Sequence, residues 1–139
     1  MGEIFTYRTR VRYSETDQQG VVFNMWFLGY FDEALTAFLD ARGPGYAEMI
    51  AGGHDVQLVH SELDWRASLR WKDEAEIAVS PSRVGTTSFT LDFAVRLAGA
   101  DDVLVTGRTV YVVVATDGSG KREIPPEIRT ALEPLTPLF

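Results

Sequence analysis

Two acidic side chains and one glycine lie in a polar turn, residues 13–24, between a strand-like segment and a long apolar segment. The acids are Glu15 and Asp17, and the glycine is Gly20. Asp17 lies a few residues before the expected start of a helix, where unpaired backbone N–H groups and the helix dipole favour negative charge. A carboxylate in such a place could attack an acyl carbonyl or deprotonate water for that attack, while the N–H groups hold the developing oxyanion.

The residues alone also allow a simpler role for Asp17. Aspartate often shapes a turn through hydrogen bonds from its side chain to the backbone, without taking part in any chemistry. Glu15 is the weaker candidate, because the alternation of the preceding strand places its side chain toward solvent. Composition and spacing leave both roles of Asp17 open.

The apolar segment after the turn predicts a helix that begins near Asn24 and runs from Met25 to Ala41. Its thin polar stripe consists of Asp32, Thr36 and Asp40 at four-residue spacing. A helix that is apolar over most of its circumference is normally buried. The sequence Arg-Gly-Pro-Gly at 42–45 ends it, because glycine can adopt the left-handed cap and proline cannot continue the helix.

Five segments show the alternation of β-strands or a β-rich composition: Ile4–Tyr13, Asp55–Leu69, Glu74–Ser82, Ser88–Leu97 and Val103–Ala115. Short helical segments are expected at Tyr46–Ala51 and from Pro125 to about Leu132. Short connections imply antiparallel neighbours. The predicted fold class is therefore α+β, with a five-stranded antiparallel sheet wrapped around one long central helix.

Length and composition indicate one globular domain, residues 1–139, with 45% hydrophobic and 24% charged residues. The absence of cysteine excludes disulfides and thiolate nucleophiles. We find no apolar run that could span a bilayer and no signal peptide, so a cytoplasmic location without a membrane partner is expected. The net charge of -7 argues against nucleic-acid binding, but one anionic small ligand could still be held by local Arg and Lys side chains.

Three other kinds of site are not supported by the sequence. The stretch Gly118–Lys121 lacks the remaining residues of a phosphate-binding loop. No Gly-x-Ser-x-Gly motif accompanies a catalytic triad. The two histidines, His54 and His60, could join Asp55, but their spacing fits no metal-ligand pattern, so we expect no metal site.

The run R-V-R-Y-S-E-T-D-Q-Q-G-V-V-F-N-M-W-F at 10–27, the long helix and the strand series resemble the hotdog-fold thioesterases of the 4-hydroxybenzoyl-CoA thioesterase family. The resemblance covers nearly the whole chain, and its most specific part is Y-x-x-T-D-x-x-G-x-V. It implies an acyl-CoA thioesterase that needs no metal or redox cofactor, with coenzyme A entering as part of the substrate.

The same resemblance assigns roles within the turn. Asp17 matches the catalytic carboxylate of the family, which acts as nucleophile or general base. The backbone N–H near Asn24 matches the donor that polarises the thioester carbonyl, and Gly20 matches the glycine that lets the turn approach the substrate. Many relatives carry His or Tyr at the position of Asn24.

Proteins of this family bind coenzyme A across a dimer interface, so a homodimer or homotetramer is expected. The buried character of Val103–Ala115 and the open sheet edges agree with an oligomer. The resemblance implies an acyl pocket and coenzyme A contacts, although each residue could instead be ordinary core or a solvated surface charge. The acyl pocket candidates are Phe23, Trp26, Phe27 and Trp65; the coenzyme A candidates are Arg70, Lys72, Arg83, Gly85, Thr86 and Ser88.

Three alternatives to an acyl-CoA thioesterase follow from the same residues. An acyl-carrier-protein thioesterase would need a basic surface for its acidic carrier, such as Arg8, Arg10 and Arg12. A hydratase or dehydratase would need a histidine beside Asp17, which His60 could supply only through the fold. A non-catalytic acyl-CoA or acyl-carrier binding protein would bind the thioester without releasing a thiol.

Overall fold

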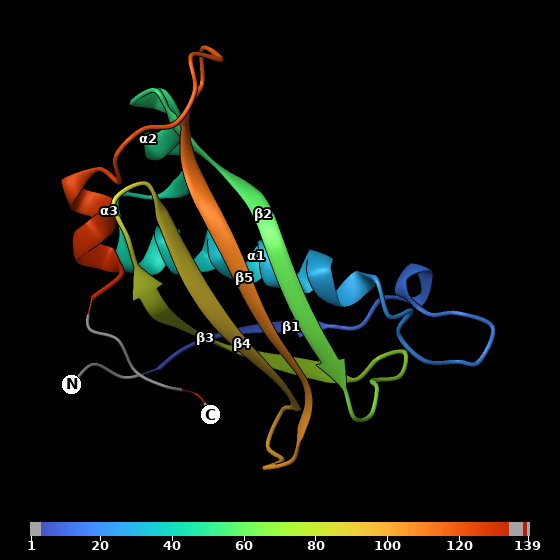
Figure 1. Ribbon diagram of the computed structural model, residues 1–139. Helices are drawn as coiled ribbons and strands as arrows, with labels where there is room; N and C mark the ends of the chain where they lie inside the picture. Colours follow the sequence, from blue (N-terminus) through green and yellow to red (C-terminus); the bar gives the residue numbers. More distant parts are fainter. Residues whose placement is uncertain (1–3, 134–137, 139) are drawn as a thin grey trace.

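The computed structural model of the chain describes residues 4–133 and 138, which form one antiparallel sheet packed on a long helix (Figure 1). The strands are β1 (Phe5–Arg10), β2 (His54–Trp65), β3 (Glu74–Val84), β4 (Ser88–Leu97) and β5 (Val103–Ala115). The helices are the 3₁₀ turn η1 (Tyr13–Glu15), α1 (Trp26–Arg42), α2 (Tyr46–Ala51) and α3 (Pro126–Ala131). The strand order is β1-β3-β4-β5-β2, with every neighbouring pair antiparallel.

Helix α1 lies across one face of the sheet and supplies much of the core (Figure 1). Its buried residues are Phe27, Tyr30, Phe31, Ala34, Leu35, Phe38 and Leu39. Removal of such side chains from water contributes about 1.5–3 kcal/mol each. The predicted buried central helix and the predicted antiparallel sheet are both confirmed.

The helix approaches the sheet most closely at Gly107 of β5. The Phe31 ring stacks on Phe93 with a centroid separation of 4.3 Å. A Cβ atom at Gly107 would lie 2.8 Å from Cζ of Phe31, so only glycine leaves room for this ring. The absence of a side chain at Gly107 therefore lets β5 approach α1 closely.

Two boundaries near the polar turn differ from the predicted ones. Strand β1 ends at Arg10 rather than Tyr13, because Val11 pairs with the 72–73 connection, donating to the Asp73 carbonyl and accepting from Lys72. The helix begins at Trp26 with Met25 as its N-cap, two residues after the predicted start.

Strand β2 ends at Trp65, four residues before the predicted end. The N–H groups of Arg66 and Ala67 both bond the Leu104 carbonyl, at 2.8 and 3.2 Å, which ends the regular ladder. The Leu69 carbonyl instead accepts from Val22 at 2.8 Å. The segment after β2 therefore packs beside the polar turn.

Strand β5 lies between β4 and β2, as its valine-rich composition predicted. Strand β2 is an edge of the sheet, and its register shifts between Leu58 and His60. Leu58 and Val59 are 44% and 55% exposed there. This apolar edge has no partner strand among residues 4–133.

No helix within residues 4–133 is long and apolar enough to cross a membrane.

Candidate active site

The polar turn is a tight hairpin. Thr16 and Val22 form an antiparallel bridge, and inside it the Asp17 N–H bonds the Val21 carbonyl at 2.8 Å. Gly20 closes the turn by donating to the Asp17 carbonyl at 2.9 Å, with a φ of +78° that favours glycine. The backbone conformation at position 20 therefore favours the glycine of the motif.

Asp17 shapes this turn, as its simpler role requires. One carboxylate oxygen, Oδ1, accepts a 2.8 Å hydrogen bond from the Gln19 N–H. Among the described residues Oδ2 accepts no hydrogen bond, and the side chain is half-buried. The turn-shaping bond thus fixes the carboxylate while one oxygen remains available to a substrate.

Glu15 is buried, so the prediction that it faces solvent is wrong. Its side chain is 9% exposed and accepts 2.8 Å hydrogen bonds from the Tyr30 hydroxyl and the Arg12 N–H. The strand alternation ends before residue 13, and the 3₁₀ turn η1 rotates Glu15 inward. Burial, followed by the bond to Glu15, raises the pKa of Tyr30 well above its usual range, which keeps the phenol protonated as a donor.

The start of α1 has unpaired donors. No side chain caps the helix, and its first turn carries no acid. Trp26 donates to the Phe23 carbonyl at 2.9 Å, but no hydrogen bond within residues 4–133 uses the N–H of Asn24 or Met25. These N–H groups can therefore bind an oxyanion.

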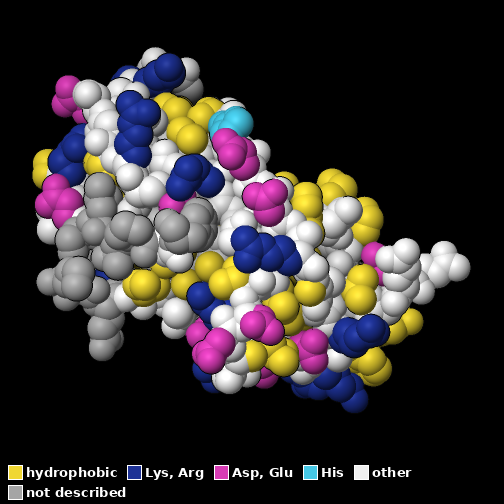
Figure 2. Space-filling view, turned by 60° about the horizontal axis from the view of Figure 1, so that its bottom comes forward, with side chains coloured by type: hydrophobic (Ala, Val, Ile, Leu, Met, Phe, Trp, Pro, Cys, Tyr) yellow, Lys and Arg dark blue, Asp and Glu magenta, His cyan; other side chains and the backbone are white. Residues whose placement is uncertain are grey.

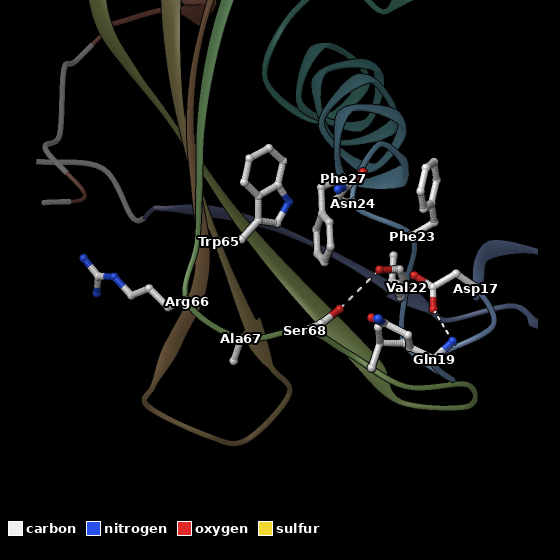
Figure 3. A pocket seen from close by; sticks show the side chains of 11 residues that line it. Asp17, Gln19, Val22, Phe23, Asn24, Phe27, Trp65, Arg66, Ala67 and Ser68 are labelled. Carbon is white, nitrogen blue, oxygen red and sulfur yellow. Dashed lines mark hydrogen bonds between the residues drawn. The ribbon is translucent and has the colours of Figure 1, made fainter.

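A pocket of about 430 Å³ lies between the turn, the start of α1 and the end of β2 (Figure 3). Phe27 enters it from α1 and Trp65 from β2, while the Asp17 carboxylate lies toward Val22 (Figure 3). The lining residues are Asp17, Gln19, Val21, Val22, Phe23, Asn24, Phe27, Trp65, Arg66, Ala67 and Ser68. The pocket combines a carboxylate, a helix start and three aromatic rings.

Five residues predicted to form the site share this pocket: Asp17, Phe23, Asn24, Phe27 and Trp65. Trp26 does not belong with them, because it lines a separate cavity beside Glu15 and Tyr30. Helical spacing explains the difference, since successive residues of α1 point about 100° apart.

The sequence analysis missed the pocket wall formed by Arg66, Ala67 and Ser68. The Ser68 hydroxyl donates to the Val22 carbonyl at 3.3 Å, whereas Arg66 extends away from the pocket (Figure 3). No local pattern marks these residues, because they reach the pocket through the pairing of Leu69 with Val22.

The predicted coenzyme A residues separate into two groups. Arg70 and Lys72 lie beside the turn: Arg70 bridges to Val21, and one of its guanidinium nitrogens passes close to Gly20. The Lys72 ammonium lies 4.5 Å from the centroid of the Trp71 ring.

The second group lies at the opposite end of the sheet. Ser88 is paired with Val112 on β5, whereas Trp65 is paired with Val105. Seven residues of a strand span about 24 Å. Arg83, Gly85 and Thr86 lie at the same hairpin, which Arg129 of α3 ties down through a 2.8 Å bond to the Gly85 carbonyl. Within one chain, this group does not reach the pocket.

Neither histidine lines the pocket. His60 is exposed on β2, with its Nε2 3.1 Å from a carboxylate oxygen of Glu62. Within residues 4–133 no cluster of His, Asp and Glu side chains could hold a metal ion.

Comparison with known proteins shows the family to which this chain belongs. Residues 11–132 match a family model described as the thioesterase-like superfamily. A 1,4-dihydroxy-2-naphthoyl-CoA hydrolase from Nostoc punctiforme is 28% identical over 130 residues, which cover 93% of this chain and 86% of that protein. The match is to the broad superfamily, so membership of the 4-hydroxybenzoyl-CoA thioesterase family stays a prediction.

Solved structures show the same fold. A 1,4-dihydroxy-2-naphthoyl-CoA thioesterase from Synechocystis superposes with a TM-score of 0.83 and 25% identity, covering 94% of this chain and 96% of that one. A gentisyl-coenzyme A thioesterase superposes with a TM-score of 0.82 and 26% identity, covering 90% and 99%. The predicted hotdog fold is confirmed.

Proposed function

This chain belongs to the thioesterase-like superfamily of thioester hydrolases, and we propose that it is an acyl-CoA thioesterase with Asp17 as its catalytic carboxylate. The observation that carries the proposal is that one aromatic-lined pocket is lined by both Asp17 and Asn24, and that the N–H groups of Asn24 and of Met25, the next residue, have no partner within residues 4–133. An acyl-CoA substrate agrees with the named activities of the relatives.

The proposed reaction begins when the thioester carbonyl binds at the helix start. Asp17 either attacks the carbonyl carbon or removes a proton from water that attacks it. The N–H groups of Asn24 and Met25 stabilise the oxyanion, and the C–S bond then breaks to release the thiol of coenzyme A. If Asp17 is the nucleophile, water hydrolyses the resulting anhydride. Both routes yield the free acid without a metal or redox cofactor.

The acyl group that suits this pocket is aromatic. Phe23, Phe27 and Trp65 offer ring faces and edges, and aromatic pairs gain about 0.5–1.5 kcal/mol beyond simple burial. The relatives named above act on naphthoyl and gentisyl thioesters, which are also aromatic. We propose an aryl-CoA ester as the preferred substrate.

We propose further that the enzyme is a homodimer or homotetramer assembled through β2. An unpaired edge that exposes Leu58 and Val59 is a template for another strand. Two-fold pairing of two β2 edges would run antiparallel and turn the partner copy's Arg83 hairpin toward this pocket. The mass of a single chain in light scattering, unchanged by Leu58→Lys, would refute the oligomer.

The decisive experiment compares thiol release by the wild type and Asp17→Asn on aryl and aliphatic CoA esters. The asparagine side-chain oxygen can still accept the Gln19 N–H, so the turn should be kept. Turnover should fall by roughly 10²–10⁴, while Asp117→Asn should leave it unchanged, because Asp117 is an exposed acid outside the pocket whose carboxylate accepts the Ser119 N–H in the same way. Near-normal turnover in Asp17→Asn would refute the assignment.

The alternatives predict different results in the same assay. Binding without thiol release from any ester would favour the non-catalytic binding protein, and release only from carrier-bound thioesters would favour the acyl-carrier-protein thioesterase. The hydratase has the least support, because neither His54 nor His60 lines the pocket.

A further inference from the structure

The side-chain amide of Gln19 is a polar group of the pocket that has no role in the reaction described so far. Gln19 lines the pocket together with Asp17. Its amide makes no hydrogen bond with any group of residues 4–133. A glutamine amide offers a carbonyl oxygen that accepts hydrogen bonds and an NH₂ group that donates two. It can therefore bind a water molecule through either end.

The backbone of the turn holds Gln19 beside the carboxylate. The Gln19 N–H donates to Oδ1 of Asp17 at 2.8 Å, and the Gly20 N–H donates to the Asp17 carbonyl at 2.9 Å. Residues 17–20 therefore form a hydrogen-bonded β-turn with Gln18 and Gln19 at its two central positions. The Gln19 side chain starts from a fixed point next to Asp17, whose Oδ2 accepts no hydrogen bond within residues 4–133.

The two central glutamines face different spaces. Gln19 lines the pocket, whereas Gln18 lines a separate depression on the other side of the turn, together with Tyr13 and Trp71. The turn projects from the body of the protein (Figure 1), and in the space-filling view of Figure 2 this projection carries mainly uncharged side chains. Both glutamines are exposed, so water reaches each of them. Gln18 is therefore a matched control for Gln19.

The other uncharged or basic polar side chains of the pocket are less suited to act with Asp17. The Ser68 hydroxyl is already bonded to a backbone carbonyl at 3.3 Å, and Arg66 extends away from the pocket (Figure 3). Asn24 lies at the start of α1, whereas Gln19 extends from the turn on the same side as Asp17 (Figure 3). Gln19 is thus the pocket amide that shares a turn with the carboxylate.

A carboxylate that acts as a base benefits from a second group that holds its water. Through one hydrogen bond to Asp17 the water can still rotate, and its lone pair is not directed at the carbonyl carbon. An acceptor for the second hydrogen fixes the water in the orientation needed for attack. The carbonyl oxygen of the Gln19 amide is such an acceptor. A carboxylate that attacked the thioester directly would have no use for it in that step.

We propose that Gln19 holds the attacking water, so that Asp17 acts as a general base and not as a nucleophile. The inference rests on the proposed function. The water donates one hydrogen to Oδ2 of Asp17 and the other to Oε1 of Gln19. Its oxygen bonds to the thioester carbon while Asp17 takes the first proton. The C–S bond then breaks, and Asp17 returns the proton to the leaving thiolate, which gives the free acid and the thiol of coenzyme A.

The first test compares Gln19→Met with Gln18→Met on an aryl-CoA ester. Methionine keeps the approximate length of glutamine but has no amide. Gln19→Met should lower kcat roughly ten- to hundredfold, the scale of one hydrogen bond to a charged group, with KM within about twofold. Gln18→Met should change neither constant. Equal losses in the two variants, or a higher KM with unchanged kcat in Gln19→Met, would overturn the proposal, the latter because Gln19 would then bind the acyl group.

A double variant separates activation of water from a purely structural role. In Asp17→Asn no base takes the proton from water, so the position of that water matters little. Adding Gln19→Met to Asp17→Asn should therefore lower turnover by less than about twofold. A further loss as large as in the wild-type background would show that Gln19 acts independently of Asp17, contrary to the proposal.

Rapid mixing of Gln19→Met with excess ester distinguishes the general base from the nucleophile. Thiol should appear at the steady rate from the start, because no acyl-enzyme accumulates. A burst of thiol equal to the enzyme concentration would show that Asp17 attacks the carbonyl, and the inference would be wrong. Turnover lost in Asp17→Asn but retained in Gln19→Met would refute this inference alone. A wild type that hydrolyses no ester would refute the proposed function and this inference with it.

Discussion

The hydroxyl of Tyr30 donates a 2.8 Å hydrogen bond to the buried carboxylate of Glu15, directly before the turn that carries Asp17. The Glu15 carbonyl also accepts from Phe23, at 2.9 Å, on the other side of the turn. Helix α1 and the turn are thereby fixed to each other by a pair that does not line the pocket. The two residues therefore hold in place the turn that carries Asp17.

Tyr30→Phe should destabilise the protein and slow the reaction without removing a catalytic group. The buried Glu15 carboxylate would keep only the Arg12 N–H, and an unsatisfied buried acceptor costs about 1–3 kcal/mol. Urea unfolding should report that loss, and thiol release should show a severalfold lower kcat with little change in KM. Tyr7→Phe is the matched control, because the Tyr7 hydroxyl makes no hydrogen bond among the described residues. Equal effects of the two variants would contradict the positioning role.

The burial of two tyrosine hydroxyls sets a pH dependence of stability at the alkaline end. Burial raises the pKa of Tyr30 and of Tyr111 above the ordinary 10.0. Above pH 10 the unfolded chain loses these protons while the folded protein keeps them. The free energy of unfolding should therefore fall as pH rises through 10, with a slope for each tyrosine that approaches about 1.4 kcal/mol per pH unit well above pH 10 and is negligible below pH 9. Urea unfolding at pH 9, 10 and 10.5 should give a shallower decline for Tyr30→Phe, and identical slopes would disprove the effect.

Features that depend on local pattern could be predicted from the sequence. Strand alternation identified β4, and apolar periodicity identified α1 with its stop at residues 42–45. The turn motif placed Asp17 beside the helix start, because chain connectivity alone fixes that proximity. In these segments the structure favoured by the local sequence is also the structure that buries their apolar side chains.

Features that depend on contacts between distant segments could not be predicted from the sequence. Glu15 faces inward because a 3₁₀ turn interrupts the strand period. Trp26 lies outside the pocket because it precedes Phe27 in α1 and therefore points about 100° away from it. The wall at 66–68 is created by the Leu69–Val22 hydrogen bond, a contact between segments far apart in sequence. The Arg83 hairpin resembles a coenzyme-binding loop locally, yet register places it at the far end of the sheet.

An ion pair between a buried acid of β4 and a half-exposed arginine of β5 provides another prediction. Asp92 is 3% exposed and is held by Arg108 at 2.8 and 3.1 Å and by the Ser82 hydroxyl at 3.1 Å. Arg108→Met would leave a buried carboxylate without its cation, at roughly 2–3 kcal/mol, less than for a fully enclosed pair because Arg108 is half-exposed. The double variant Asp92→Ala/Arg108→Met should recover part of that loss in urea unfolding. A double variant as unstable as the sum of both single variants would show that the pair is not coupled.

Gly107, the one glycine within strands β1 to β5, should not tolerate a side chain, because the Phe31 ring occupies the space that a side chain would need. Gly107→Ala forces the ring out of its stack on Phe93, and overpacking of this kind costs about 1–3 kcal/mol. Gly29→Ala on α1 is the matched control. Its Cβ would meet Trp26 at an ordinary 3.4 Å, and alanine should stabilise the helix by up to about 1 kcal/mol. Thermal unfolding should therefore shift in opposite directions for the two variants, and a Gly107→Ala protein as stable as the wild type would show that Phe31 can repack.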